Sequence, residues 1–314
     1  MDETSVGDPA GFDRSAVAAG VVLFGPDRAR LTALLAAVET DVGKVFAVVN
    51  GRIDAELRAE LRQRPRLGLI ECPVNFGVAT ALNLLALAAT LDGFPRLILF
   101  DQDSRPAEGL VARLGARFEE LARAGRNPAV VGPLMVAPSR GAAYKSPRLF
   151  RRPPAGAGTE AGAAVAVDVL ATSGSLIALE AFCRVGKFRD DYFIDAVDVE
   201  WCFRAWARGY SCWIDRDVTM IHTVGEGEIR IGPVATPRQK AFRMGAYVRN
   251  TIYGFRLGHV PARFKLRQAA YLPMQALLFW VDSGLRPSVA IGLGRAAWAG
   301  LRGRLGPPAG APDV

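Results

Sequence analysis

Residues 96 to 104 constrain the fold most, because an apolar run stops there at two acids. Residues 97 to 100 are apolar and lead directly to Asp101 and Asp103. Such a run predicts a buried parallel strand whose carboxyl end opens into the crevice where open α/β sheets bind ligands. Two carboxylates at this mouth repel each other unless a cation lies between them. The stretch therefore predicts a site for a divalent metal and a diphosphate. A surface turn is the alternative, since Asp-x-Asp is common.

Three strand–helix units precede this stretch. Apolar runs predict strands over residues 17 to 24, 44 to 49 and 67 to 71, with helices at 54 to 64 and 78 to 91. Strands that alternate with helices predict a parallel, doubly wound α/β sheet. No G-x-G-x-x-G follows the first strand, which argues against a dinucleotide-dependent oxidoreductase.

The middle of the chain combines further strands with a long excursion. Residues 137 to 163 are rich in Pro, Gly, Ala and Arg, which is typical of a long loop. We expect a helix at 108 to 123 and strands at 129 to 132, 166 to 171, 211 to 215 and 217 to 222. The strand at 166 to 171 leads to a cluster of small polar residues, Thr172, Ser173, Gly174 and Ser175.

Five acids fall within residues 190 to 200. On a helix, Asp195 and Asp198 would share one face, whereas Glu200 and Arg204 would form an i, i+4 pair on another. The positive end of a helix attracts one or two acids, but five are more than that effect explains. The helix is therefore expected to present its first acids to the crevice and to pack inward through an apolar stripe of Phe193, Val197, Trp201 and Ala205.

His222, one of two histidines, ends the last expected strand and precedes the glycine-containing segment 223 to 227. An imidazole here is either an ordinary packed residue or a ligand of a transition metal.

The chain is basic, with 39 Lys and Arg against 31 Asp and Glu. This excess favours anionic partners such as nucleotide diphosphates, lipid phosphates or an anionic membrane face. No helix-turn-helix, zinc-finger or RNP pattern points to nucleic acid. The cysteines form no C-x-x-C pair, and the amino terminus lacks a signal-peptide pattern. Both features predict a cytoplasmic protein with reduced thiols.

Four regions are expected along the chain. They are a disordered amino terminus (1 to 14), a catalytic domain (15 to 236), a basic helical region (237 to 302) and a disordered tail (303 to 314). No stretch is long and apolar enough to predict a spanning helix. The helical region either lies on an anionic membrane surface or packs against the domain or a second subunit.

Together these motifs resemble the inverting GT-A glycosyltransferases of family 2, most closely their bacterial rhamnosyltransferase branch. The resemblance covers residues 17 to 255 and implies a GT-A fold, a Rossmann-like and mostly parallel sheet flanked by helices, with a helical carboxy-terminal extension. The motifs are Gly25-Pro26-Asp27, Val49-Asn50-Gly51, Asn75-x-Gly77-x-Ala79-x-x-x-Asn83, Phe100-Asp101-Gln102-Asp103-Ser104, Thr172-Ser173-Gly174-Ser175, Phe193-Ile194-Asp195-x-x-Asp198-x-Glu200-Trp201-Cys202-x-Arg204 and His222-x-x-Gly225.

The resemblance also implies roles for individual residues. Asp101 and Asp103 would hold Mg²⁺ or Mn²⁺ on the sugar-nucleotide diphosphate, with His222 as a further ligand, and Asp198 would be the catalytic base. Helical spacing agrees, because it turns Glu200 by about 200° from Asp198. The implied substrate-binding residues are Phe24, Gly25, Asn50, Asn75, Gly77, Asn83, Asp101, Gln102, Thr172, Ser173, Gly174, Ser175, Asp195, Glu200, Trp201 and Arg204.

One position departs from the family pattern. Val49 stands where the family has an aspartate that contacts the pyrimidine base, so the base contact is open, with Asn50 as a substitute donor. The implied reaction is metal-dependent inverting transfer of a sugar, L-rhamnose from dTDP-L-rhamnose, to a hydroxyl of a cell-envelope glycan or a polyprenyl-diphosphate-linked acceptor.

Two other functions remain open. A haloacid-dehalogenase-type phosphatase also carries Asp-x-Asp after an apolar strand, but ordinarily after the first strand of its domain. The second alternative is a nucleotide-sugar-binding protein without turnover, and its only support is that Val49 replaces the aspartate of the family pattern.

Overall fold

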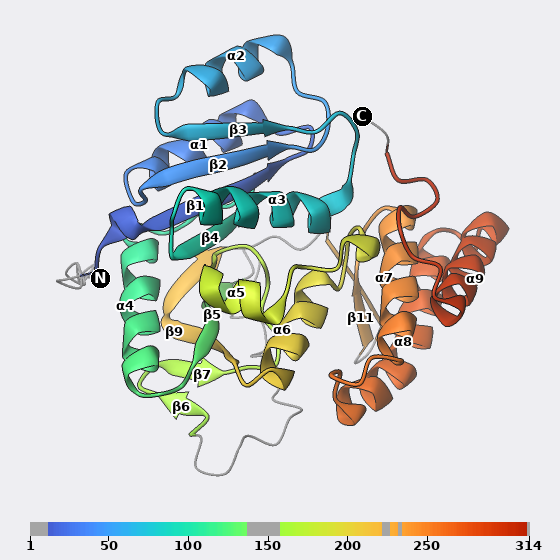
Figure 1. The fold of residues 1–314 in the computed structure, drawn as a ribbon. Coiled ribbons are helices and arrows are strands. Elements are labelled where there is room, and N and C mark those ends of the chain that lie inside the picture. Colours follow the sequence, from blue (N-terminus) through green and yellow to red (C-terminus); the bar gives the residue numbers. More distant parts are fainter. Residues whose placement is uncertain (1–11, 137–157, 222–226, 232–233, 313–314) are drawn as a thin grey trace, which may run out of the picture.

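The computed structural model describes residues 12–136, 158–221, 227–231 and 234–312, and its centre is a sheet of nine strands (Figure 1). The sheet order is β3-β2-β1-β4-β8-β5-β9-β7-β6. The strands are β1 Val17–Leu23, β2 Lys44–Val49, β3 Leu67–Glu71, β4 Arg96–Asp101, β5 Pro128–Val136, β6 Glu160–Ala161, β7 Ala164–Ala166, β8 Ser175–Ala178 and β9 Ser211–Ile221. β8 and β7 run opposite to their neighbours, so the sheet is mostly parallel, as predicted.

Helices cover both faces of the sheet. Side chains of α1, α2 and α4 pack into one apolar core, and those of α3, α5 and α6 pack into another on the opposite face. This arrangement buries both faces of β1 and β4, which explains their unbroken apolar runs. The helices are α1 Arg28–Glu39, α2 Ala55–Gln63, α3 Gly77–Leu91, α4 Leu110–Arg123, α5 Leu179–Val185 and α6 Val197–Ala207.

Three predicted boundaries were wrong. β9 is one continuous strand, and the expected break at Arg216 is an irregularity in its pairing with β5, where Pro133 pairs with Asp215 and Leu134 with Thr219. The strand expected at 166 to 171 ends at Ala166. The acid-rich helix α6 begins at Val197, so Asp195 precedes it.

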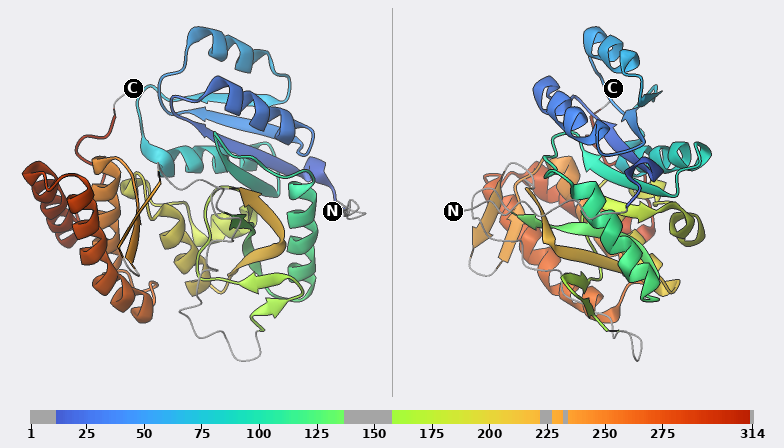
Figure 2. Two further views of the ribbon diagram at one scale, coloured as in Figure 1. Left: turned by 180° about the vertical axis from the view of Figure 1, so that it is seen from behind. Right: turned by 90° about the vertical axis from the view of Figure 1, so that its left-hand side faces the viewer.

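The carboxy-terminal helices pack beside the nine-stranded sheet rather than on it (Figures 1 and 2). They share a separate apolar core with Ile229 of a small hairpin. The elements are β10 Glu228–Ile231, β11 Val234–Pro237, α7 Ala241–Gly254, α8 Ala262–Asp282 and α9 Pro287–Arg302. In the part of the chain that the structure describes, no helix has the length and apolarity to cross a membrane.

The segment after α9 returns toward the sheet. The sequence predicts disorder from residue 303, but residues 303 to 312 are held by hydrogen bonds. The Gly306 amide donates to the Asp191 carbonyl (2.7 Å), and the Asn75 amide group donates to the Pro312 carbonyl (2.9 Å). The carboxy-terminal segment is therefore hydrogen-bonded to two loops, one at Asn75 and one at Asp191, that lie far apart in the sequence.

Candidate active site

Asp101 ends β4 and is exposed at the carboxyl edge of the sheet, as predicted. A buried serine pair supports it from behind. The Asp101 amide donates to Ser173 Oγ (3.2 Å), and Ser173 Oγ lies 2.6 Å from Ser104 Oγ. The Gly174 amide donates to the Leu99 carbonyl (2.7 Å). The small polar loop at 172 to 175 thus holds the strand end.

Gln102 turns toward the end of β1. Its side-chain oxygen accepts from the Phe24 amide (2.8 Å), and its side-chain nitrogen donates to the Phe24 carbonyl (3.2 Å). These two hydrogen bonds fix the Phe24 backbone, while the Phe24 ring remains exposed and lines a cavity. Gly25 follows with φ of +55°, a conformation that favours glycine.

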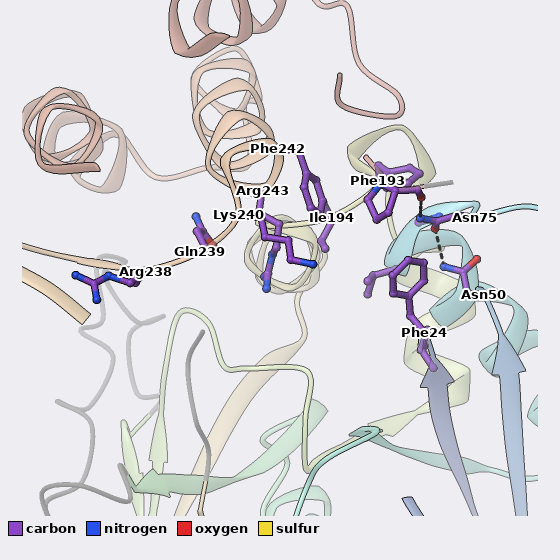
Figure 3. A pocket seen from close by; sticks show the side chains of 14 residues that line it. Phe24, Asn50, Asn75, Phe193, Ile194, Arg238, Gln239, Lys240, Phe242 and Arg243 are labelled. Carbon is purple, nitrogen blue, oxygen red and sulfur yellow. Dashed lines mark hydrogen bonds between the residues drawn. The ribbon is translucent and has the colours of Figure 1, made fainter. Parts of the chain in front are cut away.

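Two asparagines shape the next turn (Figure 3). Asn50 is buried; its oxygen accepts from the Phe76 amide (3.0 Å), and its nitrogen donates to Asn75 Oδ1 (3.1 Å). Asn75 Oδ1 also accepts from the Gly77 amide (2.9 Å). The amide of Asn50 is therefore engaged within the protein, and Val49 lies in the core. Of the pair, only Asn75 extends its nitrogen outward, to Pro312.

A cavity of ≈ 280 Å³ lies between these turns and the start of α7. Figure 3 shows Phe24, Asn50, Asn75 and Phe193 on one side and the basic side chains on the other. The residues that line the cavity are Val22, Phe24, Asn50, Asn75, Gly77, Val78, Phe193, Ile194, Arg238, Gln239, Lys240, Phe242, Arg243 and Pro312. The site prediction did not include the three cations at 238, 240 and 243, although the basic run that begins at residue 238 was visible in the sequence.

The acid turn, defined as residues 193 to 196, precedes α6 and has an unusual backbone. Phe193, Asp195 and Ala196 have φ of 64°, 64° and 60°. Asp195 therefore does not share a helical face with Asp198, which corrects the prediction. The two acids nevertheless lie close enough to influence each other's charge, and Arg243 Nη2 donates to Asp195 Oδ1 (2.7 Å).

The surroundings of Asp195 and Asp198 raise the pKa of both carboxyl groups. Burial raises the pKa of Asp198 to about 6, and the neighbouring charges of Asp195 and Asp101 add to this effect. Burial also raises the pKa of Asp195, although its hydrogen bond with Arg243 opposes the shift. A carboxylate with a pKa near 6 is suited to accept a proton near neutral pH.

Glu200, Trp201 and Arg204 lie on the inner side of α6. Glu200 is buried and accepts from Arg204 Nη2 (2.8 Å) and His259 Nε2 (2.8 Å), so the predicted i, i+4 pair is present. Burial raises the pKa of Glu200, but these two hydrogen bonds outweigh it and lower the pKa below its ordinary value. Trp201 is buried and donates to the Gly186 carbonyl (2.9 Å). These three side chains hold α6 in place.

Asn83 also has partners inside the protein. Its oxygen accepts from the Phe188 amide (2.9 Å), and its nitrogen donates to the Phe188 carbonyl (2.9 Å) and to Asp190. The structure therefore places Asn83 between α3 and the segment before the acid turn.

The predicted metal ligands are only partly described. Asp103 is exposed and lines a separate hollow beside α1, and His222 lies outside the described residues. Among the described residues, no three His, Cys, Asp or Glu side chains form a ready metal cluster. The exposed carboxylates of Asp101 and Asp103 are oxygen ligands of the kind that Mg²⁺ or Mn²⁺ takes, since Mg²⁺ commonly binds one or two carboxylates and completes its shell with substrate oxygens and water.

Comparison with known proteins finds one curated relative over most of the chain. The protein is 26% identical over 262 residues to the dTDP-rhamnosyl transferase RfbF of Shigella flexneri, a match that covers 82% of this chain and 86% of the relative. No protein-family model matches the chain.

Two solved structures show the same fold. GalNAc-T7, crystallised with UDP, GalNAc and Mn²⁺, superposes with a TM-score of 0.54 at 12% identity, over 81% of this chain and 54% of that chain. Residues 1–349 of S. aureus TarS give 0.54 at 11% identity, over 92% and 81%. The protein thus spans about half of the GalNAc-T7 chain. The fold is that of GT-A glycosyltransferases, and the findings support a glycosyltransferase that resembles the rhamnosyltransferases.

Proposed function

We propose that the protein is a metal-dependent inverting glycosyltransferase that moves L-rhamnose from dTDP-L-rhamnose to an acceptor hydroxyl. The observation that carries the proposal is Asp198, a half-buried carboxylate with pKa raised to about 6, close to Asp195 and to Asp101 at the end of β4. The donor is suggested by the name of the relative RfbF.

The donor would bind across the crevice. Its nucleoside would occupy the cavity beside Phe24 and Asn75, and its diphosphate would lie between Asp101 and the cations Lys240 and Arg243. A divalent metal held by Asp101 and Asp103 would stabilise charge on the departing diphosphate. Arg243 adds a fixed positive charge whose guanidinium matches phosphate geometry.

Asp198 would take the proton of the acceptor hydroxyl. As the acceptor oxygen forms its bond to the anomeric carbon, the bond from that carbon to the diphosphate oxygen breaks on the opposite face, which inverts the configuration. The leaving nucleoside diphosphate keeps the electron pair of the broken bond. Arg243 would hold Asp195 so that this second acid stays paired and does not compete for the proton.

We also propose that α8 and α9 rest on an anionic lipid surface, next to a lipid-linked or cell-envelope acceptor. Residues 262 to 302 contain six basic residues and a single acid, Asp282, which pairs with Arg238. Exposed apolar side chains at 266, 274, 277 and 281 recur with helical spacing along α8. The exposed large apolar residues of this region are Leu266, Met274, Leu277, Val281, Leu285, Ile291, Trp298 and Leu301. Basic charge interleaved with apolar side chains fits a lipid surface better than a second basic subunit.

A product assay tests the reaction. Purified protein with Mg²⁺ or Mn²⁺ is given a panel of sugar nucleotides and acceptors, and glycosylated acceptor is measured by mass spectrometry. Asp101→Ala and Asp103→Ala are expected to lose most transfer, with the exposed Asp217→Ala as a matched control. Phosphate release from small phosphoesters would favour the phosphatase alternative, and donor binding without product would favour the binding protein.

Liposome sedimentation tests the surface. The Leu277→Glu variant is expected to bind vesicles of anionic lipid more weakly than the wild type, whereas Leu91→Glu, an exposed apolar position on α3, should not change binding. If wild-type protein ignores anionic vesicles and instead dimerises through Leu277, the subunit interpretation replaces this one.

A further inference from the structure

The acid turn is held by a helix far away in sequence. Its three left-handed φ angles belong to non-glycine residues, a conformation that persists only where surrounding contacts enforce it. Such a turn also needs partners for its carbonyl groups, since they point away from any regular ladder. The Phe193 carbonyl accepts from the Ala79 amide of α3 (3.2 Å), and the side-chain donors to the rest of the turn come from α7.

Asn250 provides most of these contacts. It is 1% exposed, and its side-chain nitrogen lies 3.0 Å from the Tyr192 carbonyl, 2.9 Å from the Ile194 carbonyl and 2.9 Å from the Asp195 carbonyl. One amide group thus gathers three carbonyl oxygens around the turn. Only a donor fits here, because an acceptor would repel all three.

Arg249 fixes Asn250 and extends the link. Its Nε donates to Asn250 Oδ1 (3.0 Å), which orients the amide so that its nitrogen faces the turn. Its two terminal nitrogens donate to the Tyr192 carbonyl (3.1 Å) and to the Gly306 carbonyl (2.6 Å). The guanidinium fork therefore ties the acid turn, α7 and the carboxy-terminal segment together.

From these contacts we infer that Asn250, oriented by Arg249, is a positioning residue for Asp195 and Asp198. The inference rests on the proposed function. Asp195 lies within the turn, and Asp198 follows it in the first turn of α6, so the backbone that Asn250 holds sets where both carboxylates point. Arg243, two turns earlier on α7, holds the carboxylate of Asp195. A single helix thereby contacts both the backbone of the turn and the carboxylate of Asp195.

Steady-state kinetics with a donor-binding titration test the inference. Asn250→Ala and the isosteric Asn250→Asp are expected to lower kcat by about 10²-fold, the usual cost of misplacing a catalytic group by about 1 Å. The loss in kcat should exceed any rise in the dissociation constant of the donor, since Asn250 itself does not line the donor cavity, although Ile194 of the turn does. Amide hydrogen exchange at residues 193 to 196 should accelerate.

Two variants make the outcome decisive. Thr251→Val changes the next buried side chain of α7 and should leave kcat within about twofold. Arg249→Lys removes the fork but keeps the charge, and it reports on the same link if the Asn250 variants fail to fold. Near-wild-type kcat in Asn250→Asp, or a loss matched by Thr251→Val, would overturn the inference. A wild-type protein that transfers no sugar would instead reject the proposed function.

Discussion

The two carboxylate sites of the crevice are built in different ways. Asp101 lies at the end of a regular strand, where its position follows from the register that pairs it with Val22 of β1. Asp195 lies in a left-handed turn held by side chains of α7, more than 45 residues later. One site is fixed mainly by strand pairing and the other by side chains of a helix outside the sheet.

Because of this difference, the two sites should respond differently to substitutions nearby. The end of β4 tolerates changes nearby because its pairing with β1 continues to Asp101. A strained turn depends on a few buried donors and can be displaced by the loss of one of them. We therefore expect substitutions around the acid turn to affect turnover, whereas those around β4 affect donor and metal binding.

The largest effect is expected at Asp198. Asp198→Asn removes the proton acceptor without changing the size of the side chain, and a general base contributes about 10²- to 10⁴-fold in rate. We expect kcat to fall by that range, while donor binding measured by titration is retained. Normal turnover in Asp198→Asn together with an inactive Asp195→Asn would move the base to Asp195.

Gly77 joins the two regions and is the next most sensitive position. Its φ is +82°, and a Cβ there would lie 2.6 Å from the Phe193 carbonyl oxygen. Gly77→Ala should strain the backbone by roughly 1 to 3 kcal/mol and push on the acid turn. We expect kcat to fall about 10- to 100-fold, as measured by initial rates. Gly93→Ala has a similar φ but open space around it, so it should lower stability and leave kcat unchanged.

The pH dependence of kcat should report the environment of Asp198. Because the base acts when ionised, a pKa of about 6 implies that activity falls as the pH drops below about 6. Between pH 7 and pH 5 the ionised fraction falls from about nine-tenths to about one-tenth, roughly tenfold. An acidic limb centred near pH 4, the ordinary value of aspartate, would contradict the burial of Asp198.

The smallest effect on catalysis is expected at Asn83. It anchors the Phe188 backbone from α3, so Asn83→Ala should reduce stability by about 1 to 3 kcal/mol through an unpaired buried amide. The Michaelis constant of the donor should remain within about twofold, because Asn83 does not line the cavity. A rise of tenfold or more, without a change in melting temperature, would support the predicted role of Asn83 in substrate binding.

The sequence allowed prediction where the information is local. The apolar run before Asp101 was enough to place that acid at the end of a buried parallel strand, and the alternation of strands and helices was enough for the fold class. The i, i+4 pair of Glu200 and Arg204 follows from helical spacing alone.

What the sequence did not show depends on distant contacts. The helical spacing that grouped Asp195 with Asp198 assumed regular backbone, whereas α7 stabilises a turn that no local propensity favours. Likewise, Asn83 and Asn50 are polar residues in plausible binding motifs, and only their partners show that both hold loops. Arg243 reaches the site through tertiary packing, which a pattern of charges along α7 could not reveal.

The lining of the donor cavity has a consequence for synthesis of the protein. Val22 comes from the first strand, and Pro312 from the carboxy-terminal segment, 290 residues later. At about 5 to 20 residues per second, the ribosome would add Pro312 roughly 15 to 60 s after Val22. The sheet around β1 can form early, but the cavity gains its full lining only after residue 312 has been added. A nascent chain without this segment would thus hold an open crevice, and full donor binding would require that Pro312 has packed at the cavity.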